Sequence, residues 1–341
     1  MLNRKANVVM GIDIGSHSIK CVEIARNRNT LEWRRASIFP APSSPSAESL
    51  IPILKPFMEA NPAASKHLRI SVSGPSVVTR RIAIPIMTHA ELKDAMRFEA
   101  ESHVPFAIDE CVLDFQILNQ VPNQTIMNVL LAAAKRDFIQ ERLQLFSELG
   151  VVPEWIDIDT VCLVNAFEAL NDGLANKSYG LLHIGHRMSS FVIIQDTFPS
   201  FIREVPFGGF DVTKAIMDAK SIEETPAEEF KIKKLPENAE ELKAATQKGF
   251  ESLVDELKNS VDFFQNETGE ELKSIWMSGG GAMSYEAQAL LSQPLGKEVT
   301  FWDNTKRLAV QAGVDQKFSS EHAAEFNVAF GAALRGLAGT K

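Results

Sequence analysis

The sequence predicts an α/β protein built from two similar halves, each with a mixed sheet flanked by helices. Two observations carry this prediction. Strand-like segments followed by helix-like segments occur twice along the chain, and each series begins around a glycine-containing turn between two apolar runs. A length of 341 residues also matches about two domains, since a typical domain holds roughly 150 residues.

Composition argues against several classes of function. Apolar residues make up 45% of the chain and charged residues 23%, as in ordinary globular proteins. The formal net charge of -9 argues against nucleic acid as a partner. Cys21, Cys111 and Cys162 are too widely spaced for a zinc motif and fit a reducing compartment. Because we find neither a membrane-length apolar run nor a signal-peptide pattern, we expect a cytoplasmic protein without direct membrane insertion.

The first half of the chain predicts a strand hairpin followed by alternating strands and helices. The hairpin surrounds the polar turn GSHS, and a proline- and serine-rich loop then leads into a helix that ends near Ala60. Thr88 and Glu91 have the spacing of a capping box and begin another helix, which Pro105 ends. The other expected elements are strands within 68–84, strands in VLDFQIL and TIMNVLLAAA, a helix that ends at Gly150, and a strand in VVPEWIDIDT.

The second half repeats this order. After a helix near 160–171, a new strand-rich section begins at Tyr179 and contains GLLHIGHRMSSFVII and SFIREVPFGGFDVTKAI. Residues 220–270 are charged and helical in pattern, and a strand in KSIWMSGGGA then runs into a triple-glycine turn. The last segment, AAEFNVAFGAALRGLAG, is helical and rich in small residues, which suits close packing.

The two hairpin turns carry the main functional signal, because DIGS at 13–16 is matched by HIGH at 183–186. Two such hairpins that face each other can offer backbone N–H groups to a phosphate chain, and glycine lets the backbone approach it. Asp13 would supply an oxygen for Mg²⁺, usually through water. Either turn alone is also a common plain turn. His183 and His186 do not form a metal pair in this interpretation, because their spacing on a strand puts them on opposite faces.

Several segments resemble the actin-like ATPase superfamily and, within it, the PilM family of type IV pilus assembly proteins, which is related to the division protein FtsA. They are VVMGIDIGSHSIKCVEI, RFEAESHVPFAIDECVLDFQIL, LVDELKNSVDFF with SIWMSGGGA, and FNVAFGAALRGL. They cover nearly the full length in the family's order, and the second and the last are the most specific for PilM. The resemblance implies an actin-like ATPase fold, with two lobes around a nucleotide cleft and an inserted 1C-type subdomain.

The resemblance also implies ATP or ADP, with Mg²⁺, as cofactors, and it assigns binding residues in this sequence. The implied nucleotide-binding residues are Asp13, Gly15, Ser16, Ser18 and Lys20 at the first phosphate turn, Gly185 and Ser189 at the second, Gly208 and Gly209 beside the phosphates, Glu228 and Lys231 near the ribose, and Gly279, Gly280 and Gly281 at the adenosine. Asp13 is the expected metal residue, acting on Mg²⁺ through water. No catalytic residue is assigned.

The family's organisation implies four subdomains. The expected boundaries are 1–81, 160–178 and 315–341 for subdomain 1A, 82–159 for the inserted subdomain 1C, 179–220 and 270–314 for subdomain 2A, and 221–269 for the helical subdomain 2B. The resemblance therefore predicts that the first lobe is built from three separate parts of the chain.

The function that the resemblance implies is that of an adaptor. In PilM relatives a groove beside the insert captures a short N-terminal peptide of PilN, a membrane-anchored protein. We therefore expect a PilN-like partner, other inner-membrane platform proteins of the pilus, and a cytoplasmic location peripheral to the inner membrane. The expected peptide-binding residues are Phe98, Phe106 and Phe115, although aromatic residues at this spacing are also typical of a core.

One departure from the family bears on enzyme activity. Members that hydrolyse ATP usually carry an acidic residue where this chain has His183, and a neutral imidazole is a poor Mg²⁺ ligand. A protonated His183 would instead meet a phosphate oxygen, so we expect nucleotide binding rather than efficient hydrolysis. An active ATPase or small-molecule kinase is the alternative, with Asp157 and Asp159 as candidate bases. A membrane-tethered filament would need a basic amphipathic terminal helix, which ALRGLAGTK does not resemble.

Overall fold

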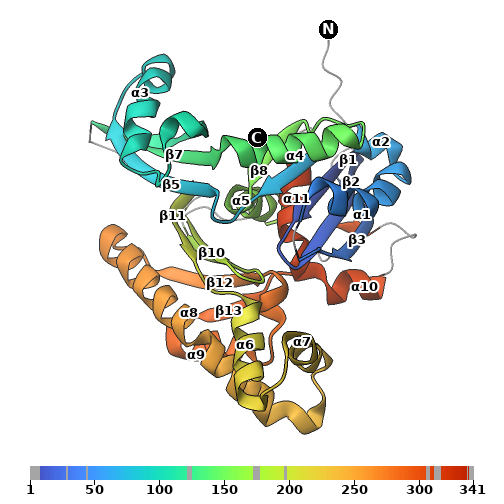
Figure 1. Ribbon diagram of the computed structural model, residues 1–341. Helices are drawn as coiled ribbons and strands as arrows, with labels where there is room; N and C mark the ends of the chain where they lie inside the picture. Colours follow the sequence, from blue (N-terminus) through green and yellow to red (C-terminus); the bar gives the residue numbers. More distant parts are fainter. Residues whose placement is uncertain are drawn as a thin grey trace.

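The computed structural model describes residues 8–27, 30–43, 45–120, 125–171, 177–195, 198–304, 308–310, 316–335 and 337. They form two lobes and a smaller insert that extends from the first lobe (Figure 1). In the described part of the chain, the first lobe holds a six-stranded sheet, the second a five-stranded sheet and the insert a three-stranded sheet. The predicted α/β fold of two similar halves is confirmed.

The sheet of the first lobe has the strand order β14-β3-β2-β1-β4-β8. Its strands are β1 (Val8–Ile14), β2 (Ser18–Asn27), β3 (Thr30–Pro40), β4 (Leu68–Val72), β8 (Trp155–Ile158) and β14 (Ala309–Val310). The helices of this lobe are α1 (Ala47–Glu59), α2 (Pro62–Ser65), α4 (Arg136–Glu148), α5 (Asp159–Leu170), α10 (Gln316–Glu321) and α11 (Asn327–Leu334). β1 runs antiparallel to β2 and parallel to β4.

Strand β1 is buried along its length. Since successive side chains of a strand point to opposite sides of the sheet, both of its faces are covered. Met10 and Ile12 pack with Leu50 and Leu54 of α1, whereas Val9 packs in a separate core with side chains of α5 and α11. Helices therefore cover both faces of this sheet, as expected for strands that are apolar throughout.

Helix α11 lies almost in backbone contact with its neighbours. A Cβ added to Gly11 of β1 would lie 2.1 Å from the carbonyl oxygen of Ala329. A Cβ added to Gly331 would lie 1.7 Å from the carbonyl oxygen of Cys162 in α5. The close packing predicted for the small-residue segment is confirmed, and each of the two contacts depends on one glycine.

The second lobe repeats the arrangement of the first. Its sheet has the order β11-β10-β9-β12-β13, in which β9 runs antiparallel to β10 and parallel to β12. The strands are β9 (Ser178–Ile184), β10 (Ser189–Gln195), β11 (Phe198–Val205), β12 (Leu272–Ser278) and β13 (Glu298–Phe301), and the helices are α6 (Gly209–Lys220), α7 (Glu224–Lys233), α8 (Ala239–Thr268) and α9 (Ala287–Leu295). The matched sequence turns therefore lie at equivalent places in two equivalent sheets.

The insert is a three-stranded antiparallel sheet of order β5-β7-β6 with one helix. Its elements are β5 (Val77–Pro85), α3 (His89–Glu101), β6 (Cys111–Gln120) and β7 (Ile126–Lys135). The capping box predicted at the start of α3 is confirmed, since Thr88 and Glu91 bond to each other's backbone N–H groups. Among the described helices, none combines the length and apolar character needed to cross a membrane.

The strand pairing differs from the predicted subdomain boundaries in two places. The predicted insert, 82–159, includes α4 and β8, but β8 pairs with β4 in the first sheet and α4 contacts α1. The insert's own sheet instead spans 77–135. The predicted range 270–314 includes β14, which pairs with β3 of the first lobe. Both differences arise from pairing between strands far apart in sequence, which local patterns do not report.

Candidate nucleotide-binding site

The two matched turns have the same backbone geometry. The N–H of Gly15 donates to the carbonyl oxygen of Ser18 at 3.1 Å, and the N–H of Gly185 donates to that of Met188 at 3.0 Å. A Cβ would lie 2.9 Å from the accepting oxygen at Gly15 and 2.7 Å from it at Gly185. Each turn is therefore too tight for a side chain at its first position, which accounts for the glycine in both sequences.

Both turns face one cavity of about 720 Å³ between the lobes. Most of the predicted binding residues line it, namely Asp13, Gly15, Ser16, Ser18, Lys20, Gly185, Gly209, Glu228, Lys231, Gly280 and Gly281. These residues come from β1, β2, the two turns, α6, α7 and the short 3-10 helix η3 (Gly280–Met283). The fold therefore brings together residues that the sequence spreads over more than half of the chain.

Three of the predicted residues shape the backbone around the cavity but do not line it. The Ser189 hydroxyl is buried and donates to the carbonyl oxygen of Phe207 at 2.8 Å. A Cβ on Gly208 would lie 2.3 Å from the carbonyl oxygen of His186, so this glycine lets α6 begin against the second turn. Gly279 has a φ of +88° and donates its N–H to Ala324. Ser190, the neighbour of Ser189, lines the cavity instead.

The floor of the cavity holds a buried ion pair. Asp13 and Lys20 face each other across the β1–β2 hairpin, and Oδ2 of Asp13 lies 3.6 Å from Nζ of Lys20. Burial raises the pKa of Asp13 above its ordinary value, while the Lys20 ammonium opposes that rise. A charge that is costly to bury is thus kept beside the opposite charge.

Asp159, at the start of α5, is a second carboxylate at this floor. Its pKa is raised to about 7, first by burial and then by the negative charge of Asp13. Its Oδ1 atom has no hydrogen-bond partner in the described part of the chain. Asp157, the other candidate base, is separate from the cavity lining and accepts a hydrogen bond from Arg335 at 2.9 Å. Of the two candidate bases, Asp159 is therefore the one that combines a cavity position with an unpaired oxygen.

The second hairpin has different chemistry at the position that corresponds to Asp13. His183 is buried, and its Nδ1 lies 2.9 Å from the Ser278 hydroxyl. Burial, and then the charge of Lys20, lower the pKa of His183 to about 3. The imidazole is therefore neutral at physiological pH in the protein without ligand. A contact between a protonated His183 and a phosphate oxygen stays a prediction.

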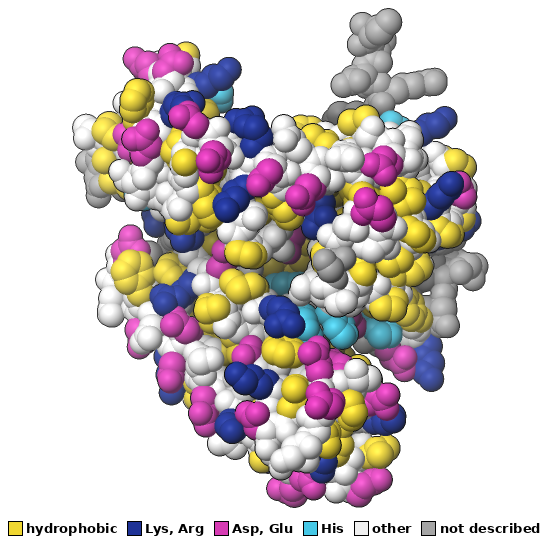
Figure 2. All heavy atoms as spheres, in the orientation of Figure 1, with side chains coloured by type: hydrophobic (Ala, Val, Ile, Leu, Met, Phe, Trp, Pro, Cys, Tyr) yellow, Lys and Arg dark blue, Asp and Glu magenta, His cyan; other side chains and the backbone are white. Residues whose placement is uncertain are grey.

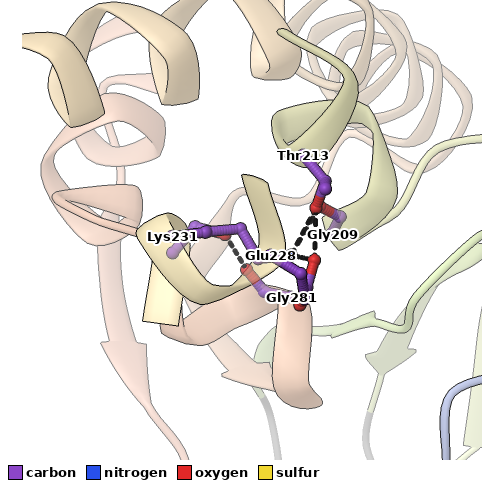
Figure 3. A network of polar contacts seen from close by, with 6 residues as sticks. Gly209, Thr213, Glu228, Lys231 and Gly281 are labelled. Atoms are coloured by element: carbon purple, nitrogen blue, oxygen red, sulfur yellow. Dashed lines mark hydrogen bonds and ion pairs between the residues drawn. The ribbon is translucent and has the colours of Figure 1, made fainter. Parts of the chain in front are cut away.

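Glu228 and Lys231 form a network that ties α7 to the beginning of α6 (Figure 3). The Lys231 ammonium donates to the Gly209 carbonyl at 3.0 Å, to the Thr213 hydroxyl at 2.7 Å and to the Glu228 carboxylate at 2.8 Å. Burial disfavours the Glu228 charge, but Lys231 holds the pKa of this carboxyl below its ordinary value. The ribose contacts of the two residues stay a prediction. In the structure both side chains hydrogen-bond within the protein and hold α7 against α6.

Sequence reasoning missed several residues that line the cavity. Ser71 and Ser73 approach from the end of β4, and His322 and Glu325 from the segment between α10 and α11. Glu325 holds a hydrogen bond with His322, which raises the pKa of that imidazole. No local motif marks these positions, because they meet the hairpins only through the folded sheet.

The three aromatic residues predicted for partner binding lie in different environments. Phe98 is on α3 and is 73% exposed. Phe106 and Phe115 are partly buried against the core of the insert, with the Lys135 ammonium 5.0 Å from the Phe106 ring. Their role in binding stays a prediction, and Phe98 is the most available of the three for a contact with another chain.

Comparisons with known proteins agree with this architecture. The model of the family described as type IV pilus assembly protein PilM matches residues 11–337. A solved structure described as a PilM-PilN type IV pilus biogenesis complex is similar with a TM-score of 0.85 and 25% identity, covering 96% of this chain and 98% of that one.

Two further solved structures share the fold at lower identity. They are the ethanolamine utilization protein EutJ from Carboxydothermus hydrogenoformans (TM-score 0.54, 12% identity, 96% of this chain and 89% of that one) and MreB5 of Spiroplasma citri bound to ADP (TM-score 0.52, 11% identity, 95% and 94%). The predicted actin-like ATPase fold is therefore confirmed. This chain belongs to the PilM family of type IV pilus assembly proteins.

Proposed function

We propose that this chain is an adaptor of type IV pilus assembly that binds ATP or ADP between its lobes and the N-terminal peptide of a PilN-like protein on its surface. The observation that carries the nucleotide part is the pair of glycine turns with matching geometry that face one cavity. A volume of about 720 Å³ lies within the usual range for small-molecule sites. MreB5, which shares the fold, was solved with ADP bound.

The residues at the cavity floor fit Mg²⁺. This ion prefers oxygen ligands and keeps several waters, and Asp13 and Asp159 supply two carboxylates, one with an unpaired buried oxygen. Bound Mg²⁺ would neutralise part of the phosphate charge. Lys20 holds Asp13 in place and adds a fixed positive charge, while the glycine turns let the backbone approach the phosphates from both lobes.

Thermal unfolding with Mg-ATP, Mg-ADP and Mg-GTP tests this site. A nucleotide at one hundred times its dissociation constant should stabilise the fold by about 2.7 kcal/mol. Ser16→Glu places a negative charge on the first turn and should weaken the stabilisation, because like charges repel. Ser102→Glu, on the exposed end of α3, is the matched control and should leave it unchanged. Equal unfolding temperatures with and without every nucleotide would refute nucleotide binding.

The peptide part of the proposal rests on family membership and on the similar PilM-PilN complex. Exposed apolar side chains lie on the insert and at its junction with the first lobe. Phe98 is 73% exposed, Val152 is 71% exposed and Trp155 on the edge strand β8 is 46% exposed. A peptide that covered such side chains would gain hydrophobic burial, and its membrane anchor would hold this chain at the cytoplasmic side of the inner membrane, near other platform proteins.

Titration of the chain with the N-terminal peptide of a PilN-like protein tests this surface. We expect Phe98→Ala or Trp155→Ala to weaken binding at least tenfold, and the variant that does so locates the peptide. Phe263→Ala is the matched control, because this phenylalanine is 56% exposed on α8 of the other lobe. Unchanged affinity in all three variants would exclude both positions, and no binding by the unaltered chain would refute the adaptor role.

A working ATPase is a second candidate, and the position of Asp159 favours it. A carboxyl with a pKa near 7 in the cavity is suited to accept a proton from water. The neutral His183 at the family's acidic position favours binding without efficient turnover. Steady-state release of phosphate decides between them. Turnover that Asp13→Ala abolishes would establish an ATPase, and Asp159→Asn would then show whether this carboxyl takes part.

A further inference from the structure

Histidines are concentrated at the candidate nucleotide site. Four of the chain's seven, namely His17, His183, His186 and His322, line the cavity. Figure 2 shows histidine side chains gathered where the two lobes meet. His183 is buried at the floor, whereas His17 is exposed and His186 half-buried at the tips of the two turns. The last two are therefore the imidazoles that a ligand would meet first.

The two tip histidines touch across the gap between the lobes. Their rings are stacked, with centroids 4.6 Å apart and an interplanar angle of 27°. The ring of Phe210 in α6 supports the second turn, lying 5.5 Å from the His186 ring and 4.2 Å from the Arg187 guanidinium. This contact places one imidazole from each phosphate turn at the same point of the cavity.

The cavity needs additional positive charge to hold a phosphate chain. Its lining includes six carboxylates and only five Lys or Arg side chains. Two of these cations already pair with carboxylates, Lys20 with Asp13 and Lys231 with Glu228. A nucleotide would add several negative charges to this surface, so cations or protons must accompany it.

The surroundings of His186 make it a group that can take up such a proton. Burial, then the adjacent His17 and the positive charges of Lys231 and Arg187, lower the pKa of His186 to about 4, while Glu228 opposes them. The ring is therefore neutral between pH 5 and 8 in the protein without ligand. A phosphate group next to the ring would favour the protonated form, because an opposite charge within a few ångströms raises the pKa of an imidazole.

We propose that His17 and His186 together form a phosphate-binding pair that takes up a proton when the phosphate chain of a nucleotide binds, so that the site holds nucleotide more tightly as pH falls. This inference rests on the proposed nucleotide binding and adds its pH regulation. The proton goes to a ring nitrogen of one imidazole, which then donates a hydrogen bond to a phosphate oxygen. The second ring remains neutral, because two protonated rings in stacking contact repel each other.

Linkage sets the sign and the size of the effect. Bound phosphate raises the pKa of His186, so affinity increases as pH falls from above the raised pKa towards about 4. Uptake of one proton changes the dissociation constant by at most tenfold per pH unit. ATP carries more charge than ADP, so its binding should favour the protonated ring more strongly. The difference in affinity between ATP and ADP should therefore be largest at mildly acidic pH.

Isothermal titration calorimetry of Mg-ATP and Mg-ADP at pH 6.0, 7.0 and 8.0 tests the proposal. Titrations in two buffers of different ionisation enthalpy give the number of protons taken up. His17→Asn, His186→Asn and the double variant keep a polar side chain but cannot be protonated in this range. His103→Asn removes an exposed histidine of the insert and is the matched control. The nucleotide's own phosphate titration is common to all variants and cancels in the comparison.

We expect the unaltered chain and His103→Asn to take up about one proton more than the double variant at pH 6.0, and to bind Mg-ATP several-fold more tightly at pH 6.0 than the double variant does. If the double variant binds nucleotide with the same proton uptake and pH dependence as the unaltered chain, the proposal is overturned while nucleotide binding stands. Absence of binding at every pH would overturn both. If His186→Asn does not fold, the exposed His17→Asn variant still tests the pair, because affinity for Mg-ATP at pH 6.0 equal to that of the unaltered chain would show that His17 has no part in it.

Discussion

The two hairpins at the cavity have the same backbone and different electrostatics. Both close with a hydrogen bond from a glycine N–H to a carbonyl three residues later. The first buries the ion pair of Asp13 and Lys20, whereas the second buries the neutral His183 against Ser278. The comparison teaches that turn geometry and site charge are separate properties. The repeat preserves the backbone that approaches an anion, while the side chains decide what chemistry is available there.

Removal of the cation from the first hairpin should have the largest effect. We expect Lys20→Ala to lower the free energy of unfolding by about 3–5 kcal/mol at pH 8, because it leaves the Asp13 charge buried without a partner. Ser278→Ala removes the partner of His183 in the second hairpin and should cost only about 1 kcal/mol. Denaturant unfolding measures both values. Equal losses would show that the two hairpins are alike in electrostatics as well as in backbone.

The turn glycines test the shared backbone directly. Gly15→Ala and Gly185→Ala should each lower the free energy of unfolding by about 1–3 kcal/mol, because a methyl group would lie less than 3.0 Å from a backbone carbonyl oxygen. We expect similar losses in the two variants by denaturant unfolding. A loss in only one of them would contradict the structural equivalence of the turns.

The buried imidazole of the second hairpin should make stability depend on pH. An unfolded chain protonates His183 below pH 6.5, but the folded chain holds its pKa at about 3. Stability from this residue is therefore complete above pH 6.5 and is lost as pH falls, by about 1 kcal/mol between pH 7 and pH 5.5. His183→Asn should flatten the profile in that window. A variant profile as steep as that of the unaltered chain would assign the effect to other groups.

The smallest expected effect concerns the exposed tips of the turns. Arg187→Ala removes a guanidinium that lies 4.2 Å from the Phe210 ring centre and should cost about 0.5–1 kcal/mol. Ser16→Ala, at the exposed tip of the first turn, should change stability by less than about 0.5 kcal/mol. Thermal unfolding of the two variants in parallel detects this difference. A larger loss for Ser16→Ala would mean that the first tip carries contacts of its own.

Local patterns predicted the parts of the fold that are formed locally. The glycine turns, the capping box at Thr88 and the helical character of the small-residue segment each depend on residues a few positions apart. The end of the insert was not predictable in this way. β8 is as strand-like as its neighbours, but its membership of the first sheet depends on pairing with β4, some eighty residues earlier.

The site was predictable where it follows the turns and not where it depends on side-chain direction. Ser189 and Ser190 are adjacent and chemically identical, yet only Ser190 lines the cavity, because alternate residues of a strand face opposite sides. Asp159 was recognised only as one of two equivalent aspartates. Its raised pKa comes first from burial and then from Asp13, which the fold brings close to it although the two residues are far apart in the sequence.

The packing of α11 on β1 has a consequence for how the chain acquires its structure during synthesis. Strand β1 needs a helix made from residues 327–334, so its lobe closes a very long loop when it forms. The second lobe, from β9 to β13, is continuous in sequence, so its sheet closes shorter loops. Since a nascent chain emerges from its N-terminus, the half that is translated first should be the half that folds last, and it would depend on chaperones in the meantime.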